Sequence, residues 1–258
     1  MKLNFGKKVV LVTGGGRDIG KEISNIFADE GASVAINYNN SSKDAEQTAE
    51  EINSKGGIAK IFKADITRYN EVLKMVQSIK KDLGSIDFLI NNAGAAWGEP
   101  FENFSENGWN KVMDLNVKSI FFLTQKFKSL LLKRASLDDP SRIINIGSID
   151  GLNVPAFETY SYSTSKAAVH HLTRVLAAKL VKENILVNAI APGPYPSAML
   201  GSAVNSDYSE IEKNNPRKRL GTPEDIAGLT IFLCSRAGAY TVGAVSYTHL
   251  TLPTKRIV

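Results

Sequence analysis

Short apolar runs alternate with amphipathic stretches along most of the chain. The runs are rich in valine, isoleucine and leucine, as is typical of strands buried on both faces of a sheet. They predict strands at residues 9–12, 33–37, 58–63, 86–90, 142–146 and 186–190. The amphipathic stretches predict helices at residues 19–30, 43–55, 70–83, 105–113, 117–134 and 160–183.

This alternation predicts the fold class. Strands and helices in strict succession form a parallel sheet with right-handed crossovers. We therefore expect an α/β fold with one Rossmann-type, doubly wound parallel sheet and helices on both faces. No linker, repeat or charge block divides residues 1–244, so we expect a single dinucleotide-binding catalytic domain there.

The last stretch, residues 245–258, reads VSYTHLTLPTKRIV. One interpretation is a divergent last strand, because the positions alternate in character. We favour the hypothesis that the string is a translated library adapter, which would be non-native and would replace the last strand. An inactive truncated product is then a further possibility for the chain. Sequencing the source genome through codon 258 tests this.

Composition places the chain among ordinary globular proteins. Its 258 residues are 43% hydrophobic and 22% charged, which suffices for a core without disulfides. With Cys234 as the single cysteine and no segment like a signal peptide, we expect a cytoplasmic location. The net charge is +5, but the basic residues are interspersed with acidic ones, so we expect no nucleic-acid binding. Apolar runs such as 120–123 are too short to span a membrane, so we expect no membrane binding.

A glycine-rich turn, TGGGRDIG at residues 13–20, follows the first predicted strand and precedes the first predicted helix. Glycines there let backbone N–H groups approach a pyrophosphate, and the helix N-terminus adds partial positive charge. A glycine run alone is weak evidence, but the strand–turn–helix context favours a phosphate-binding site.

Tyr162 and Lys166 lie four residues apart on a predicted helix and therefore share a face. An ammonium group beside a phenol lowers the pKa of the phenol, which favours proton transfer. Such pairs also arise by chance. Ser148, at the end of a predicted strand, favours the catalytic interpretation, because catalytic groups gather at the carboxyl ends of parallel strands.

Two adjacent histidines, His170 and His171, suggest a metal site at first sight. Neighbours on a helix point about 100° apart, so the two cannot easily share an ion. The third histidine, His249, lies in the doubtful tail. We predict no metal site.

Six motifs in order resemble those of the short-chain dehydrogenase/reductase family. They are TGGGRDIG at 13–20, NNAG at 91–94, Asn116, Ser148, the Tyr162–Lys166 pair and Pro192-Gly193. The resemblance covers residues 5–244, and six motifs at the family's spacing are highly specific.

The resemblance implies catalytic roles for four residues. Tyr162 would be the general acid in reduction and the base in oxidation, and Ser148 would hydrogen-bond the substrate carbonyl oxygen. Lys166 would hold the nicotinamide ribose and tune Tyr162, and Asn116 would anchor a water leading to Lys166.

The resemblance also implies the residues that bind the cofactor. These are Gly14, Gly16, Arg17, Ile19, Gly20, Asn37, Asp65, Ile66, Asn92, Ala93, Gly94, Tyr162, Lys166, Pro192, Gly193 and Ser197. Members that prefer NAD commonly carry aspartate where this chain has the neutral Asn37. Because Arg17 and Lys43 offer positive charge to a 2′-phosphate, we expect NADP(H).

One position departs from the family pattern: Asp18 stands where glycine is usual. Aspartate is a good helix N-cap and tolerates left-handed backbone angles. We therefore expect Asp18 to cap the first helix, with its carboxylate turned away from the phosphates.

Within the family, the stretches at 91–97, 108–116, 142–148 and 191–199 resemble the 3-oxoacyl-carrier-protein reductases, and most of all the reductase of the rhamnolipid pathway. The resemblance implies NADPH-dependent reduction of a 3-oxoacyl thioester, carried by acyl-carrier protein or coenzyme A. A sugar or polyol dehydrogenase and a non-catalytic dinucleotide-binding protein remain alternatives. The family resemblance further implies that the protein forms a homotetramer or homodimer.

Overall fold

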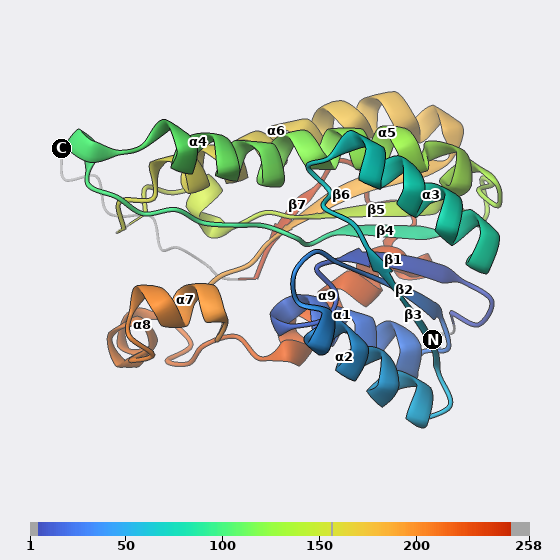
Figure 1. Cartoon of the computed structure of the whole chain (residues 1–258), viewed down its shortest axis with the longest axis horizontal. Coiled ribbons are helices and arrows are strands. Elements are labelled where there is room, and N and C mark those ends of the chain that lie inside the picture. Colours follow the sequence, from blue (N-terminus) through green and yellow to red (C-terminus); the bar gives the residue numbers. More distant parts are fainter. Residues whose placement is uncertain (1–4, 156, 249–258) are drawn as a thin grey trace.

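The computed structural model describes residues 5–155 and 157–248 (Figure 1). Seven parallel strands form one sheet in the order β3-β2-β1-β4-β5-β6-β7. They are β1 (Val9–Thr13), β2 (Ser33–Tyr38), β3 (Ile58–Lys63), β4 (Phe88–Asn91), β5 (Ser141–Ile146), β6 (Ile185–Ala191) and β7 (Val245–Tyr247). The order reverses at β1, as in doubly wound sheets, which confirms the predicted fold class.

Helices cover both faces of the sheet. Figure 1 shows α1, α2 and α9 on one face and α3 to α6 on the other, with α7 and α8 to one side. The helices are α1 (Asp18–Asp29), α2 (Ser42–Ser54), α3 (Tyr69–Leu83), α4 (Glu106–Met113), α5 (Ser119–Leu132), α6 (Tyr160–Leu180), α7 (Ala198–Ala203), α8 (Ser209–Asn214) and α9 (Pro223–Cys234). None of the helices in the described part of the chain is long and apolar enough to cross a bilayer.

The central strand β1 shows why the apolar runs predicted burial on both faces. Val10 and Val12 enter the core under α1, α2 and α9, whereas Val9 and Leu11 enter the core under α3, α5 and α6. Side chains alternate across a strand, so only a continuous apolar run can fill both cores.

The element boundaries differ from the predicted ones in a few places. A π-helical turn at Asp114–Lys118 joins α4 to α5, and α6 ends at Leu180 before a 3₁₀ turn. Helix α9 was not predicted. Its start carries a recognisable signal, because Thr222 and Asp225 form a capping box and Pro223 is the first helical residue.

The start of the doubtful tail forms the last strand of the sheet, β7. Val245–Tyr247 pair in parallel with Ala189–Ala191 of β6, and the Thr248 hydroxyl accepts a hydrogen bond from the Gly193 N–H at 3.1 Å. The start of the tail thus completes the sheet, as the strand interpretation expects. Residues 249–258, which include His249, lie outside the described residues, and the origin of the tail stays a prediction.

Candidate active site

The glycine-rich turn between β1 and α1 is tightly packed. Gly14 has a φ of +61°, and a Cβ built on Gly20 would collide with the Gly14 carbonyl oxygen. The Asn92 amide donates to the carbonyl oxygens of Thr13 and Gly14 at 3.0 and 3.2 Å, and the Ala93 N–H donates to the Thr13 hydroxyl at 3.0 Å. The end of β4 therefore fixes the turn, which leaves a side-chain-free cradle of the kind that a dinucleotide pyrophosphate requires.

Arg17 projects where this turn meets the start of α2. A Cβ on Gly16 would lie 2.7 Å from the Ala45 Cα, and the Thr48 hydroxyl donates to the Gly16 carbonyl at 2.9 Å. The Arg17 side chain is 60% exposed and stands 3.8 Å from the Asp18 carboxylate. The turn thus carries an exposed positive charge, and the contact of Arg17 with a 2′-phosphate stays a prediction.

Asp18 does not cap α1, contrary to expectation. The N-cap is Arg17, without a side-chain capping bond, and Asp18 is the first helical residue with a φ of +48°. Its carboxylate instead accepts the Ala198 N–H at 3.3 Å. The left-handed backbone is the reason glycine is usual here, and an aspartate tolerates it better than most residues.

Asn37 lies buried at the end of β2, but its side chain has structural partners. The amide donates to the carbonyl oxygens of Phe62 and Ala64 at 3.2 and 3.1 Å, across the β2–β3 connection. The Asn37 side chain carries no charge, so it would not repel the 2′-phosphate of NADP(H). Its N–H groups are nevertheless occupied by the main chain.

We expect Asn37→Asp to destabilise the fold, because a carboxylate would face two carbonyl oxygens that lose their donors. The loss should be about 1–3 kcal/mol in the free energy of unfolding. Urea titration measures it, with the exposed Asn40→Asp as control. Equal stability of the two variants would contradict the assignment of the Asn37 amide bonds.

Asp65, predicted to bind adenine, caps the turn after β3. Its carboxylate accepts hydrogen bonds from the N–H and the hydroxyl of Thr67 at 2.9 and 2.7 Å, and it pairs with Arg68 at 3.3 Å. The neighbouring Ile66 is buried in the core. A turn cap and an adenine contact are compatible, and the second stays a prediction.

Ser148, Tyr162 and Lys166 converge beyond the carboxyl ends of β5 and β6. The Lys166 ammonium lies 5.4 Å from the centre of the Tyr162 ring and donates to the Ile146 carbonyl at 2.8 Å. Tyr162 is hydrogen-bonded to Ser148, whose hydroxyl also accepts the Asp150 N–H at 3.1 Å. The three residues that the sequence pattern selected therefore meet at one place.

The pKa of Tyr162 moves opposite to expectation. Burial raises it to about 12, the Ser148 hydrogen bond lowers it less, and the Asp150 charge raises it further. Burial likewise lowers the pKa of Lys166 to about 8, against the opposing charge of Asp150. Desolvation is the largest cause of both shifts, and the raised pKa of Tyr162 favours the protonated phenol.

Asn116 lies in the π-helical turn and binds the segment after β4. Its amide donates to the Ala95 carbonyl and to the Ser165 hydroxyl, both at 2.9 Å, and its oxygen accepts the Ala95 N–H at 2.9 Å. A Cβ on Gly94 would stand 3.2 Å from the Asn116 oxygen and 3.7 Å from the Lys166 nitrogen. Asn116 and Gly94 therefore border Lys166, whereas the catalytic role of Lys166 and the water relay stay predictions.

The segment after β6 closes the site from the other side. The Pro192 carbonyl accepts the Ile149 N–H at 3.1 Å, which ties this segment to the turn that carries Ser148. The Ser197 hydroxyl caps α7 by accepting the Leu200 N–H at 3.2 Å. Contacts of Gly193, Ser197 and the partly buried Ile19 with a nicotinamide dinucleotide stay predictions.

His170 is a residue of the site that sequence reasoning missed. It is buried, its Nε2 accepts the Ser148 N–H at 3.4 Å, and a Cβ on Gly147 would collide with its ring. Burial and nearby positive charges lower its pKa to about 4, so the ring is neutral and supports the serine turn. His171 is exposed, which confirms that the pair diverges. The described residues contain no group of three potential metal ligands.

Known proteins resemble the chain over nearly its whole length. A family model described as enoyl-(acyl carrier protein) reductase matches residues 14–249. The rhamnolipids biosynthesis 3-oxoacyl-[acyl-carrier-protein] reductase of Pseudomonas aeruginosa is 40% identical over 243 residues, covering 92% of this chain and 93% of that protein. The 3-oxoacyl-[acyl-carrier-protein] reductase FabG of Staphylococcus epidermidis is 35% identical over 94% of this chain and 97% of its own length.

The fold similarity is equally extensive. The structure titled Pseudomonas aeruginosa RhlG/NADP active-site complex superposes with a TM-score of 0.90 at 36% identity, covering 95% of this chain and 96% of that chain. The six ordered motifs, the doubly wound sheet and the converging serine, tyrosine and lysine agree with these matches. The chain belongs to the short-chain dehydrogenase/reductase family of oxidoreductases.

Proposed function

We propose that this protein is an NADPH-dependent reductase that converts a 3-oxoacyl thioester to the 3-hydroxyacyl product. The convergence of Ser148, Tyr162 and Lys166 at the carboxyl edge of the sheet, beside the glycine-rich turn, carries the proposal. The names of the relatives, two of them 3-oxoacyl-[acyl-carrier-protein] reductases, support the substrate class.

The side chains account for the proton transfer in such a reduction. The Ser148 hydroxyl binds the carbonyl oxygen, and the Tyr162 phenol, held protonated by its raised pKa of about 12, donates a proton to that oxygen. Lys166, with a pKa lowered to about 8, can return a proton near neutral pH. When bound, NADPH supplies the hydride to the carbonyl carbon.

The cofactor assignment has its own support. Gly14, Gly16 and Gly20 form the side-chain-free turn, and Asn92 holds it closed. Arg17 supplies an exposed positive charge in that turn, and the neutral Asn37 at the end of β2 offers no carboxylate to repel a 2′-phosphate. The RhlG structure holds NADP.

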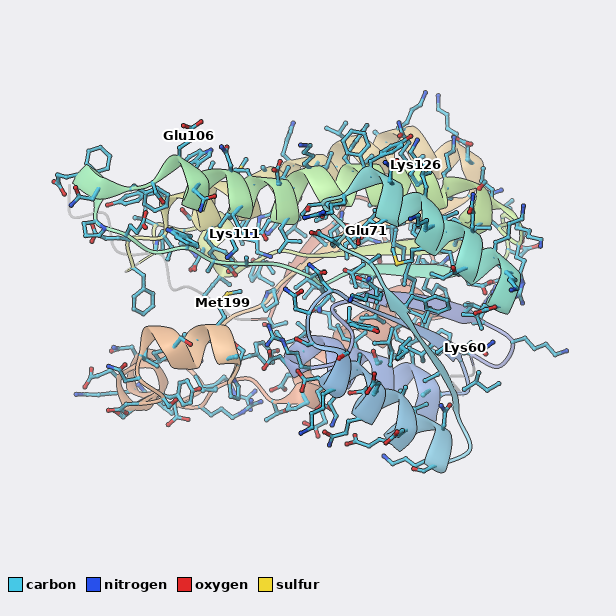
Figure 2. The ribbon with its side chains drawn as sticks, viewed as in Figure 1. Lys60, Glu71, Glu106, Lys111, Lys126 and Met199 are labelled. Carbon is cyan, nitrogen blue, oxygen red and sulfur yellow. The ribbon has the colours of Figure 1, made fainter. Side chains whose placement is uncertain are left out.

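The segment after Gly193 favours an acyl chain. Figure 2 shows the Met199 side chain rising from α7 toward the body of the domain, and it is 41% exposed. Tyr195 is instead buried and packs against Gly221, so its ring belongs to the core. An exposed thioether suits an apolar chain better than a polyol, whose hydroxyls need polar partners.

Lys133 and Arg134, which follow α5, are basic residues that an acidic carrier protein could contact, but both already have partners within the chain. Arg134 pairs with Asp87 at 3.3 Å, and Glu183 pairs with Lys128 at 2.7 Å. Lys133 donates to the Gly84 carbonyl. These pairs reduce the positive charge offered to an acidic carrier, so coenzyme A is as suitable a carrier of the thioester as acyl-carrier protein.

Two further proposals concern assembly and location. Apolar side chains are exposed on the outer faces of α5 and α6, among them Phe121 at 42% and Val175 at 52%, and they suit the interface of a homodimer or homotetramer.

Cys234 is buried and burial raises its pKa to about 12, so it is an unreactive core thiol, as a cytoplasmic enzyme permits.

We expect the wild-type enzyme with NADPH to reduce acetoacetyl-coenzyme A with a higher kcat/KM than it shows for any glucose- or polyol-type substrate with NADP⁺. Loss of NADPH absorbance measures the reaction. A higher value for a polyol would replace the acyl assignment and leave the oxidoreductase assignment intact. Cofactor binding without any turnover would instead indicate a dinucleotide-binding protein.

A further inference from the structure

Asp150 occupies the second position after Ser148, in the 3₁₀ turn Ile149–Gly151. Its N–H donates to the Ser148 hydroxyl at 3.1 Å. The turn is pressed against α6, because a Cβ on Gly151 would lie 2.6 Å from the Lys166 carbonyl carbon. The backbone therefore holds the Asp150 side chain beside the catalytic residues.

The Asp150 carboxylate accepts no hydrogen bond and forms no ion pair with any residue between 5 and 248 that the structure describes. It is half-buried, and burial raises its pKa while the Lys166 charge lowers it. Burial disfavours the charged form of this carboxylate, so its charge responds to the groups placed beside it.

The carboxylate also borders open space. Asp150 lines a cavity of about 550 Å³ between the segment after β5 and the start of α6. The rest of the lining includes Leu152, Val154 and Phe157. Glu158 lines the cavity as well, but of these two acidic residues Asp150 is the one whose charge acts on Tyr162 and Lys166.

We propose that Asp150 is a specificity-determining residue that admits neutral 3-oxoacyl esters and thioesters and rejects the free 3-oxo acid. The carboxylate of a free 3-oxo acid lies two carbons from the reacting carbonyl, so binding of the ketone to Ser148 and Tyr162 would bring two negative charges together. Esterification removes that charge. The inference rests on the proposed function and deepens it, because it explains how an activated acyl substrate is selected.

Like charges in a half-buried site repel strongly, whereas a neutral group pays no such cost. The carboxylate can in addition accept a hydrogen bond from an N–H or hydroxyl on the group that carries the acyl chain. Both effects favour binding of the thioester on its carrier over binding of the free acid.

A matched pair of substrates tests the proposal: acetoacetate and its ethyl ester, which share the reacting carbonyl. We expect the wild type to prefer the ester. Asp150→Asn should raise kcat/KM for acetoacetate about 10- to 100-fold, the effect of removing one like charge in a partly buried site, and should change the value for the ester much less. Asp138→Asn, at an exposed position before β5, alters the net charge equally and should leave the ratio of kcat/KM for the ester to kcat/KM for acetoacetate unchanged.

A second readout separates a charge effect from a packing effect. The Asp150 charge raises the pKa values of both Tyr162 and Lys166, and the neighbouring His170 is neutral above about pH 4. Asp150→Asn should therefore move the alkaline limb of the pH profile for ester reduction to lower pH. If this variant has a reduced Tm, Asp150→Ser repeats the test.

An unchanged ratio of the two substrates in folded Asp150 variants that reduce the ester would overturn this inference and leave the proposed function standing. If the wild type reduced neither acetoacetyl-coenzyme A nor the ester, the proposed function would fall and the inference with it. The two failures are therefore distinguishable.

Discussion

Tyr162→Phe is expected to abolish reduction while NADPH binding is nearly unchanged. Phenylalanine keeps the ring that packs beside Lys166 and removes the hydroxyl that is hydrogen-bonded to Ser148. Loss of a positioned general acid costs roughly 100- to 10,000-fold in rate. Steady-state loss of NADPH absorbance measures the rate, and quenching of protein fluorescence measures the binding.

The matched control for this variant is Tyr240→Phe, because the Tyr240 side chain is fully exposed. The control should retain full turnover. If Tyr162→Phe kept more than about a tenth of wild-type activity, Tyr162 would not be the acid, because an effect that small is below the range for general acid catalysis.

Arg17→Ala is expected to weaken the binding of NADPH and to leave that of NADH nearly unchanged. A charge-assisted hydrogen bond to the 2′-phosphate contributes about 1.5–3 kcal/mol, which corresponds to roughly 10- to 150-fold in Kd. The wild type should accordingly prefer NADPH. Titration of each variant with both cofactors measures the four dissociation constants.

Lys81→Ala provides the control for Arg17→Ala, since Lys81 is an exposed basic residue on α3. Lys81→Ala should change neither the Kd for NADPH nor the Kd for NADH. An equal loss of affinity for both cofactors in Arg17→Ala would assign Arg17 to the pyrophosphate or to the fold rather than to the 2′-phosphate. Equal kcat/KM for the two cofactors in the wild type would contradict the NADP(H) preference itself.

Local sequence sufficed for the fold class and for the heart of the site. The apolar runs and amphipathic stretches report burial directly, because side chains alternate in strands and repeat with a period of 3.6 residues in helices. The glycine-rich turn and the Tyr162–Lys166 spacing are local too. Their geometry follows from one turn and one helix, and Ser148 joins them because parallel strands end at the same edge.

Interactions between distant segments were decided only by the tertiary structure. The Asn37 amide is occupied by the carbonyl oxygens of Phe62 in β3 and Ala64 just after it, and Asp18 reaches Ala198, 180 residues away. Neither contact follows from spacing, since the partners are set by how strands pair and where loops pack. The direction of the Tyr162 pKa shift was likewise missed, because burial depends on the whole fold and raises this pKa more than the Ser148 hydrogen bond lowers it.

His170 and Asp150, the two residues that the structure adds to the site, show the same contrast between sequence and tertiary structure. In the sequence, His170 is one of two adjacent histidines and Asp150 one acidic residue in a connecting segment. Packing of the Ser148 turn against α6 buries His170 under the serine and brings Asp150 near Tyr162 and Lys166. Sequence determined which groups the chain carries and which elements they begin or end. The chain's tertiary packing decided which groups lose water and face one another, because desolvation and through-space charge depend on the folded surroundings rather than on sequence separation.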